Sequence, residues 1–342
     1  MEPFRKILDE RIPLLWDGAT GTELYNRGIF INRCFEDANL SNPSLVKTLH
    51  QEYAHAGAQV LKTNSWGANS FKLRTHNLHD KVHEINSKAA SIAREVAENN
   101  IYVAGSVGPL GVRIEPWGPT SFSEAHNAFK AQIEGLLEGG IDFISLETFS
   151  DISELKQALD AARSIEPSIP VVAHMVIDME GRLLLGSPLE WAIGELDRWK
   201  VDAVGLNCSV GPGPMLSAVG KIRSVTNLPI SLQPNAGLPK TVDGRKIYMC
   251  SPEYMGEFAK NFLQAEVQFI GGCCGTSPEH IKAMANAIRH RSAMVINEAL
   301  AVRPANQTKK KEEVSEKVER VPLEKKSQWS AKIAKGEKVY AC

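Results

Sequence analysis

The chain has 342 residues, of which 43% are apolar and 23% charged, and its formal net charge is -1 at pH 7. This length and composition are typical of a globular protein with one large domain. The near-neutral charge gives no general attraction to nucleic acid or to an anionic membrane, so we expect neither as a partner. We find no secretory signal near the start and no apolar run of the ~20 residues that span a bilayer. We therefore expect a cytoplasmic location.

Short apolar runs, bounded by Gly, Pro, Asn or Ser, predict buried strands along the chain. They lie at 14–17, 60–64, 101–106, 143–147, 171–177, 203–208, 230–235 and 269–273. Segments with helical character alternate with them, at 44–56, 81–98, 123–138, 152–165, 189–199, 215–225, 252–263 and 278–290. Several of these helices are preceded by a Ser, Asn or Pro that suits a helix N-terminus.

The strict alternation of strand and helix predicts an α/β fold with a parallel sheet covered by helices. Eight such units are the number that closes into a (β/α)8 TIM barrel, which we expect over residues 1–302. An open doubly wound sheet is the alternative, because periodicity cannot show closure. Residues 303–342 are rich in charge and predict a solvated linker or tail. Their last part regains apolar residues, and we expect it to lead into a second domain.

Three cysteines stand at the ends of predicted strands. Cys208 ends the sixth strand, and Cys273 and Cys274 end the eighth. In a barrel these strand ends share the catalytic mouth, so the three thiols would converge. Thiolates select zinc over magnesium or calcium, and three ligands leave a coordination position for substrate. Two other interpretations stay open, namely buried small residues and a redox-active vicinal disulfide; we expect Cys34 and Cys250 to be small buried residues.

A three-thiolate zinc is suited to binding a substrate thiol as a thiolate. A free thiol with a pKa of ~8.5 is only a few per cent ionised at pH 7, whereas metal coordination deprotonates it outright. The cysteine pattern therefore predicts alkyl transfer to a thiol.

Ordered motifs over residues 10–292 resemble the homocysteine S-methyltransferase family. These motifs are Asp17–Glu23, Thr63–Lys72, Gly108–Pro109, Leu146–Thr148, Gly205–Cys208 and Gly271–Gly275. The family includes betaine-homocysteine methyltransferase and the homocysteine module of cobalamin-dependent methionine synthase. The resemblance implies methyl transfer to the zinc-bound thiolate of L-homocysteine, giving methionine, with no separate protein base.

The resemblance also implies roles for individual residues. Cys208, Cys273 and Cys274 would bind Zn2+, with the homocysteine sulfur in the fourth position. Glu147 would face the amino group of homocysteine, and the turn formed by Asp17, Gly18, Ala19 and Thr20 would present backbone N–H groups to its carboxylate. Asn64 is a further candidate for substrate binding, and Asn235 for a position near the metal. Each has a plainer alternative: an ion pair for Glu147, capping of a turn for Asp17, and loop shaping for the two asparagines.

The methyl donor is left open by the motifs, since family members use S-methylmethionine, S-adenosylmethionine, methylcobalamin or betaine. Residues 108–119 and 327–342 also resemble fusions with methylenetetrahydrofolate reductase, so we expect such a domain as a covalent partner. Two alternative functions, from other classes of protein, remain. One is a barrel lyase or aldolase that uses Lys62 as a Schiff-base amine, and the other is a non-catalytic scaffold that holds zinc. His174, within the fifth strand, is expected to be a core histidine.

Overall fold

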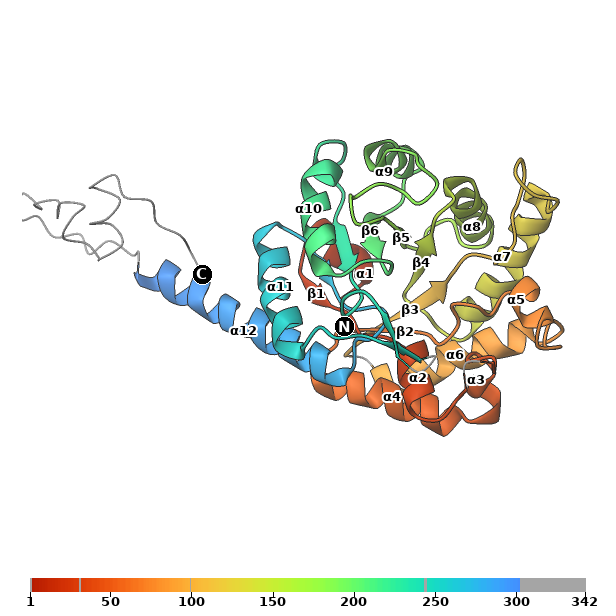
Figure 1. Ribbon diagram of the computed structural model, residues 1–342, viewed down its shortest axis with the longest axis horizontal. Coiled ribbons are helices and arrows are strands. Elements are labelled where there is room, and N and C mark those ends of the chain that lie inside the picture. The colour runs from red at the N-terminus through yellow and green to blue at the C-terminus, as the bar shows by residue number, and fades with distance from the viewer. Residues whose placement is uncertain (1, 31, 99, 243–244, 302–342) are drawn as a thin grey trace, which may run out of the picture. The chain divides into compact units, whose positions relative to one another are not determined.

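The computed structural model describes residues 2–30, 32–98, 100–242 and 245–301. Met1–Ile296 form one compact unit, which contains the predicted barrel (Figure 1). The predicted tail at 303–342 and the expected second domain lie outside the described residues, so the domain boundary stays a prediction. Among the described helices, none has both the length and the apolar character needed to cross a bilayer.

Eight parallel strands form the central sheet. They are β1 (Leu14–Leu15), β2 (Val60–Lys62), β3 (Tyr102–Val107), β4 (Phe143–Phe149), β5 (Val171–Met175), β6 (Ala203–Asn207), β7 (Ile230–Gln233) and β10 (Phe269–Ile270). The hydrogen-bonded order is β1-β10-β7-β6-β5-β4-β3-β2. A parallel bridge between Trp16 and Val60 joins the two ends of this order. The predicted (β/α)8 barrel is thus confirmed, and the open doubly wound sheet is excluded.

Helices surround the strands as the alternation predicted (Figure 1). They are α4 (Pro43–Ala56), α6 (Val82–Ala97), α7 (Phe122–Glu138), α8 (Ile152–Ile165), α9 (Leu189–Arg198), α10 (Pro212–Arg223), α11 (Pro252–Gln264) and α12 (Pro278–Ala301). Side chains cap several N-termini where the sequence indicated: Asn42 accepts a hydrogen bond from Leu45, and Ser121 forms a capping box with Glu124. These caps satisfy backbone N–H groups that have no partner inside the helix.

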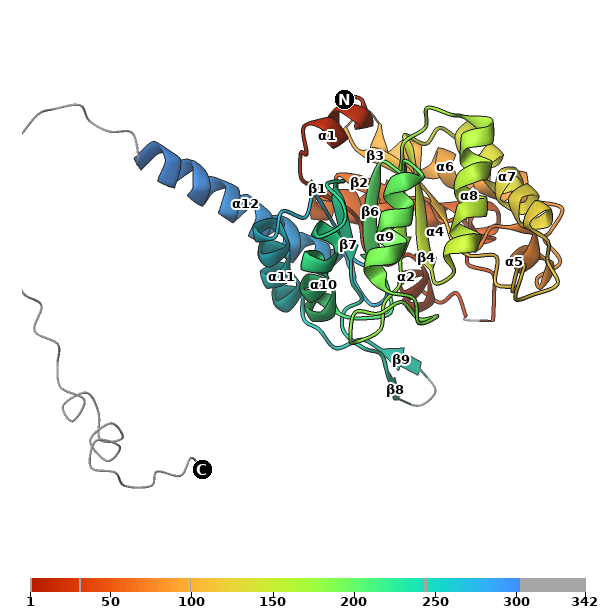
Figure 2. The same cartoon turned by 90° about the horizontal axis from the view of Figure 1, so that it is seen from above.

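Several short elements were not predicted. They are α1 (Phe4–Asp9), α2 (Gly21–Asn26), α3 (Ala38–Ser41), α5 (Ser70–Arg74) and the antiparallel hairpin of β8 (Lys240–Val242) and β9 (Arg245–Ile247). Each is too short to show a hydrophobic period in the sequence. Figure 2 shows α1 and the hairpin at opposite ends of the barrel. The hairpin belongs to the connection after β7, which places it at the catalytic mouth.

The barrel interior is apolar at one end and polar at the other. At the amino ends of the strands, Phe4 from α1 stacks on Phe143 with ring centroids 3.8 Å apart. Trp16, Tyr102 and Phe269 belong to the same buried cluster. This apolar plug seals one end of the barrel, so access to the interior is left to the carboxyl ends of the strands.

Candidate active site

The three predicted cysteine ligands converge at the carboxyl ends of the strands. Cys208 follows β6, and Cys273 and Cys274 follow β10; in the sheet these two strands flank β7. The three Sγ atoms lie within 4.8 Å of one another, and those of Cys208 and Cys274 are 3.8 Å apart. All three are free thiols, so no vicinal disulfide is present. Cys34 and Cys250 are half-buried and lie outside this cluster.

The sulfur geometry fits a tetrahedral zinc ion. A Zn–S bond of ~2.3 Å at the tetrahedral angle requires sulfur atoms about 3.8 Å apart, which is the separation of Cys208 and Cys274. Among the described residues, no fourth Cys, His, Asp or Glu joins the group. The buried Oδ1 of Asn235 has no hydrogen-bond partner in the described part of the chain. The donor set therefore fits a three-thiolate metal site.

The backbone around Cys208 is held in an unusual conformation. Cys208 and Ser209 have φ angles of 59° and 62°, in the left-handed region that residues with a Cβ rarely adopt. Cys208 N donates to Gln233 O at 3.0 Å, and Val210 N donates to Cys208 O at 2.7 Å. Such a conformation costs about 1–3 kcal/mol and persists only where the surroundings impose it. Here it turns the Cys208 thiol toward the thiols that follow β10.

The thiols influence one another's ionisation. Hydrogen bonds from the Cys208 and Cys273 thiols lower the pKa of Cys274. Hydrogen bonds to Cys208 and Cys274, together with burial, raise the pKa of Cys273. One thiol thus ionises at the expense of its neighbours, because adjacent negative charges repel. A bound divalent cation would let all three ionise together.

Lys62 lies buried between two carboxylates beside the cysteine cluster. Its Nζ is 3.8 Å from Asp17 Oδ1 and 3.6 Å from Glu147 Oε2, and it donates to Gln233 Oε1 at 2.8 Å. Burial opposes the charge on Lys62, but Glu147 and Asp17 outweigh it and raise the pKa of the amine above its usual value. A Schiff-base lysine needs a neutral amine, and therefore a lowered pKa. The structure thus disfavours the aldolase interpretation.

Glu147, at the end of β4, is 4% exposed. Its carboxylate accepts a hydrogen bond from Ser106 Oγ and forms the ion pair with Lys62. The plainer alternative, an ion pair with a basic neighbour, is therefore realised. The Nδ2 of Asn207 lies 3.4 Å from Glu147 Oε2 and 3.9 Å from Cys273 Sγ. One amide thus links Glu147 to the cysteine cluster.

The turn after β1 is packed closely against the loop after β10. Asp17 and Ala19 donate their N–H groups to Val60 O and Thr276 O; a role of this turn in binding a substrate carboxylate stays a prediction. A Cβ on Gly18 would lie 2.8 Å from Thr276 O, so the approach requires glycine. Burial raises the pKa of Asp17 to about 7, against the influence of Lys62. The side chain of Asp17 accepts from Lys62 N at 2.8 Å instead of capping the turn.

The two candidate asparagines differ in their surroundings. The amide of Asn64 donates to Phe35 O at 2.8 Å and to Asn39 Oδ1 at 3.1 Å, which ties the strand end to the preceding loop. These contacts agree with loop shaping; a role for Asn64 in substrate binding stays a prediction. Asn235, by contrast, keeps its buried Oδ1 without a partner among the described residues, as a group reserved for a ligand would.

Sequence reasoning missed the polar residues that connect these groups. Asn207 bonds to Thr148 N at 2.7 Å, and Gln233 bonds to Lys62. Both end observed strands, β6 and β7, and lie one and two residues before the ends of the predicted strands at Cys208 and Asn235, so a rule that took only the last residue of each predicted strand passed over them. His174 is a core residue as expected, since its ring bonds to Leu146 O and Ser231 Oγ and burial lowers its pKa to about 3.

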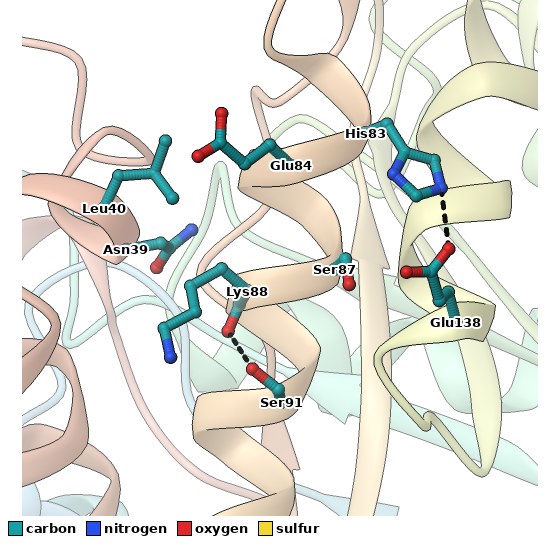
Figure 3. A pocket seen from close by; sticks show the side chains of 8 residues that line it. All are labelled: Asn39, Leu40, His83, Glu84, Ser87, Lys88, Ser91 and Glu138. Carbon is teal, nitrogen blue, oxygen red and sulfur yellow. Dashed lines mark hydrogen bonds and ion pairs between the residues drawn. The ribbon is translucent and has the colours of Figure 1, made fainter.

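A surface groove lies elsewhere, in the outer helical layer (Figure 3). It has a volume of about 500 Å³ and lies between α3, α6 and α7. Two of its lining residues are in contact: His83 Nε2 lies 3.1 Å from Glu138 Oε2, and both side chains are more than half exposed. Since its walls are helices and not strand ends, this groove has no part in the chemistry of the cysteine cluster.

Fold and site together define a (β/α)8 barrel protein with three convergent thiols and a buried carboxylate–lysine group at its catalytic mouth. The sequence model of the homocysteine S-methyltransferase family matches residues 14–288. The chain belongs to this family, which confirms the resemblance seen in the sequence.

Individual relatives agree with this assignment. The chain is 32% identical over 299 residues to a methionine synthase of Mycobacterium tuberculosis; the match covers 82% of this chain and 25% of the relative. The methionine synthase of Mycobacterium leprae is also 32% identical, and the chain spans about a quarter of the length of these curated relatives. Among solved structures, the metallated form of the homocysteine methyltransferase MmuM from Escherichia coli superposes with a TM-score of 0.71 at 26% identity, covering 83% of this chain and 99% of that one.

Proposed function

We propose that this chain transfers a methyl group to the sulfur of L-homocysteine and so forms methionine. The convergence of Cys208, Cys273 and Cys274 at the barrel mouth is the observation that carries the proposal. When zinc is bound by these three thiolates, it supplies a fourth position in which a substrate sulfur is held as a nucleophilic thiolate. Membership of the family supports homocysteine as the thiol.

The groups beside the cysteines suit an amino acid. Lys62 carries one positive charge, whereas Glu147 and Asp17 together offer two carboxyl groups. The carboxylate that Lys62 does not balance would accept the ammonium group of homocysteine near Glu147. The N–H groups of Gly18 and Thr20, in the turn after β1, would then receive its carboxylate. Binding both ends of the substrate would hold its sulfur in line with the donor methyl group.

The chain's own residues also keep the site dry and ordered. Asp17, Lys62 and Gln233 are buried, so water competes little with the substrate for these groups. We also place the protein in the cytoplasm, because a reducing compartment keeps the three thiols available for metal. The methyl donor is sought among S-methylmethionine, S-adenosylmethionine, methylcobalamin and betaine.

The test compares the reduced wild type with Cys208→Ser and, as a matched control, Cys250→Ser, whose thiol lies outside the cluster. We expect one zinc per chain in the wild type and the control, and its loss in Cys208→Ser. Titration with L-homocysteine should release about one proton per molecule bound, and each donor is then tested for methionine formation. Absence of zinc from the reduced wild type would contradict the proposal. Bound zinc without proton release on addition of homocysteine would contradict it too, and would favour a non-catalytic scaffold that holds zinc.

A further inference from the structure

The ring of His174, on strand β5, is fully buried inside the barrel. It meets the indole of Trp16 edge-on, with ring centroids 6.0 Å apart. A Cβ built on Gly205, in strand β6, would lie 2.8 Å from His174 Cδ2, closer than real Cβ contacts allow. Glycine at position 205 thus makes room for the imidazole inside the barrel.

Hydrogen bonds connect this ring to Lys62. The Nδ1 atom of the ring lies 3.2 Å from Leu146 O, and Nε2 lies 2.8 Å from Ser231 Oγ and 3.3 Å from Gln233 Nε2. At its other end, the Gln233 amide accepts a hydrogen bond from Lys62 Nζ through Oε1, at 2.8 Å. This chain of contacts links strands β4, β5, β7 and β2, and all of its side chains are buried.

The two ends of the chain of contacts fix the groups between them. The Lys62 ammonium can only donate, so Gln233 presents its oxygen to Lys62 and its NH2 group to His174. Leu146 O can only accept, so Nδ1 of His174 carries the ring proton. Nε2 is then the acceptor of a neutral ring, which agrees with the pKa of about 3 to which burial and Lys62 lower His174. A single tautomer of His174 therefore satisfies every contact.

The Gln233 amide determines where the charge of Lys62 lies. Lys62 Nζ is 2.8 Å from the amide oxygen, but 3.6 Å from Glu147 Oε2 and 3.8 Å from Asp17 Oδ1. Direct hydrogen bonds between an ammonium and a carboxylate are about 2.7–2.9 Å long. Lys62 is therefore held short of direct contact with either carboxylate. This leaves the Glu147 carboxylate able to bind a second cation.

We propose that His174 is a positioning residue for substrate recognition, because it orients the Gln233 amide that holds Lys62. Lys62, held in this way, leaves the Glu147 carboxylate open for the ammonium group of homocysteine. This inference rests on the proposed function, because it takes Glu147 as the group that binds the ammonium. Without the acceptor on His174, the Gln233 amide can turn its NH2 group toward Lys62. The amine would then move against Glu147 and compete with the substrate.

The test measures the binding of two thiols to the reduced, zinc-loaded full chain by calorimetry. One thiol is L-homocysteine, and the other is 4-mercaptobutanoate, which is homocysteine without its amino group. The variants are His174→Leu and Gln233→Leu, alone and together. His50→Leu is the matched control: His50, on helix α4, is also buried, but neither of its ring nitrogens has a hydrogen-bond partner among the described residues.

We expect His174→Leu to weaken the binding of L-homocysteine about tenfold, the order of losing one hydrogen bond to a charged group. The binding of 4-mercaptobutanoate should not change, because this thiol has no ammonium group. The double variant should bind homocysteine no more weakly than Gln233→Leu, since both residues act through one chain of contacts. His50→Leu should match the wild type with both thiols. Equal weakening of both thiols in His174→Leu, or losses that add in the double variant, would contradict the proposal.

The tautomer of His174 gives a second measurement, made on the wild type. NMR of the chain with 15N-labelled histidine reports which ring nitrogen carries the proton. We expect it on Nδ1, without titration between about pH 6 and pH 8. The His174 signal is identified by its loss in His174→Leu or, where that variant does not fold, by its displacement in Ser231→Ala. A proton on Nε2 would contradict the proposal, because the Gln233 amide would then be reversed.

The failures of the two proposals are distinguishable. Homocysteine that binds wild type and His174→Leu with equal affinity, and releases a proton from both, contradicts only the role of His174. A zinc-loaded wild type that releases no proton with homocysteine contradicts the proposed function, and with it the recognition assigned to His174.

Discussion

The ammonium of Lys62 lies 3.6 Å from the carboxylate of Glu147, and both side chains are almost fully buried. A charge taken out of water is costly unless a partner compensates it. Asp17 and Gln233 complete the surroundings of the amine. This group therefore stabilises the barrel mouth, and the proposed function assigns it the binding of the charged groups of the substrate as well.

Replacing Lys62 by Met should destabilise the protein by about 3–5 kcal/mol, because the carboxylates of Glu147 and Asp17 would be left buried without a cation. Lys47→Met is the matched control: Lys47 forms an ion pair with Glu95 at 3.0 Å on the surface, and its loss should cost about 0–1 kcal/mol. Urea unfolding measures both. Similar free energies of unfolding for the two variants would contradict a structural ion pair at Lys62.

Replacing Asn207 by Ala should destabilise the protein by about 1–3 kcal/mol, because Thr148 N loses its buried acceptor. Thr148 has a φ of 71° and depends on this bond at 2.7 Å. Homocysteine affinity should fall too, since the link between Glu147 and the cysteines is removed. Asn227→Ala, at an exposed position, is the control. A variant of Asn207 that binds homocysteine as tightly as wild type would show that the link is dispensable.

Replacing Gly18 by Ala should destabilise the protein by about 1–3 kcal/mol through overpacking. The new Cβ would meet Thr276 O and the Tyr53 hydroxyl, each at 2.8 Å. Gly213→Ala is the matched control, because nothing lies within 4 Å of its Cβ and the residue is in helix α10. There alanine should stabilise the helix by up to ~1 kcal/mol. Thermal unfolding of the two variants measures the contrast. Equal melting temperatures of Gly18→Ala and wild type would contradict overpacking and mean that the turn shifts to make room for the new Cβ.

Glu154 on α8 should make stability depend on pH. Burial raises the pKa of Glu154 from 4.5 to about 7, with Lys72 and Asp151 as its charged neighbours. The folded protein therefore binds the proton more tightly than the unfolded chain. Its contribution to stability is present below pH ~4.5 and is lost as the pH rises to ~7. The size of this loss is about 3 kcal/mol.

The variant Glu154→Gln keeps an acceptor for Leu110 N, which Glu154 bonds at 2.7 Å, but does not titrate. Urea unfolding at about pH 5 and pH 8 should show a smaller fall in stability than in wild type. Part of the fall remains, because the pKa of Asp17 is also raised, to about 7. Glu134→Gln, on the exposed side of α7, is the control. An unchanged pH dependence in Glu154→Gln would contradict the shift.

Most of the barrel could be predicted from the sequence, because its strands are fully buried and its helices amphipathic. The predicted strand 269–273 is shorter in the structure, as β10 ends at Ile270. Beyond it, Gly272 N donates to Asp17 O at 3.0 Å, outside the regular ladder that pairs Leu14 with Phe269 and Leu15 with Ile270. The early end of β10 depends on a hydrogen-bond partner distant in the chain, so the residues around position 270 alone do not predict it.

The eight-fold alternation, the three cysteines at strand ends and the family could all be recognised from the sequence, since each is a pattern of residue types along the chain. Closure of the barrel through Trp16 and Val60 became visible with the folded chain. So did the ion-paired state of Lys62 and the contact of His174 with Gly205. These outcomes depend on distances between residues far apart in the chain. They also depend on the balance between the cost of burying a charge and its attraction to nearby opposite charges. Local composition and spacing reveal neither.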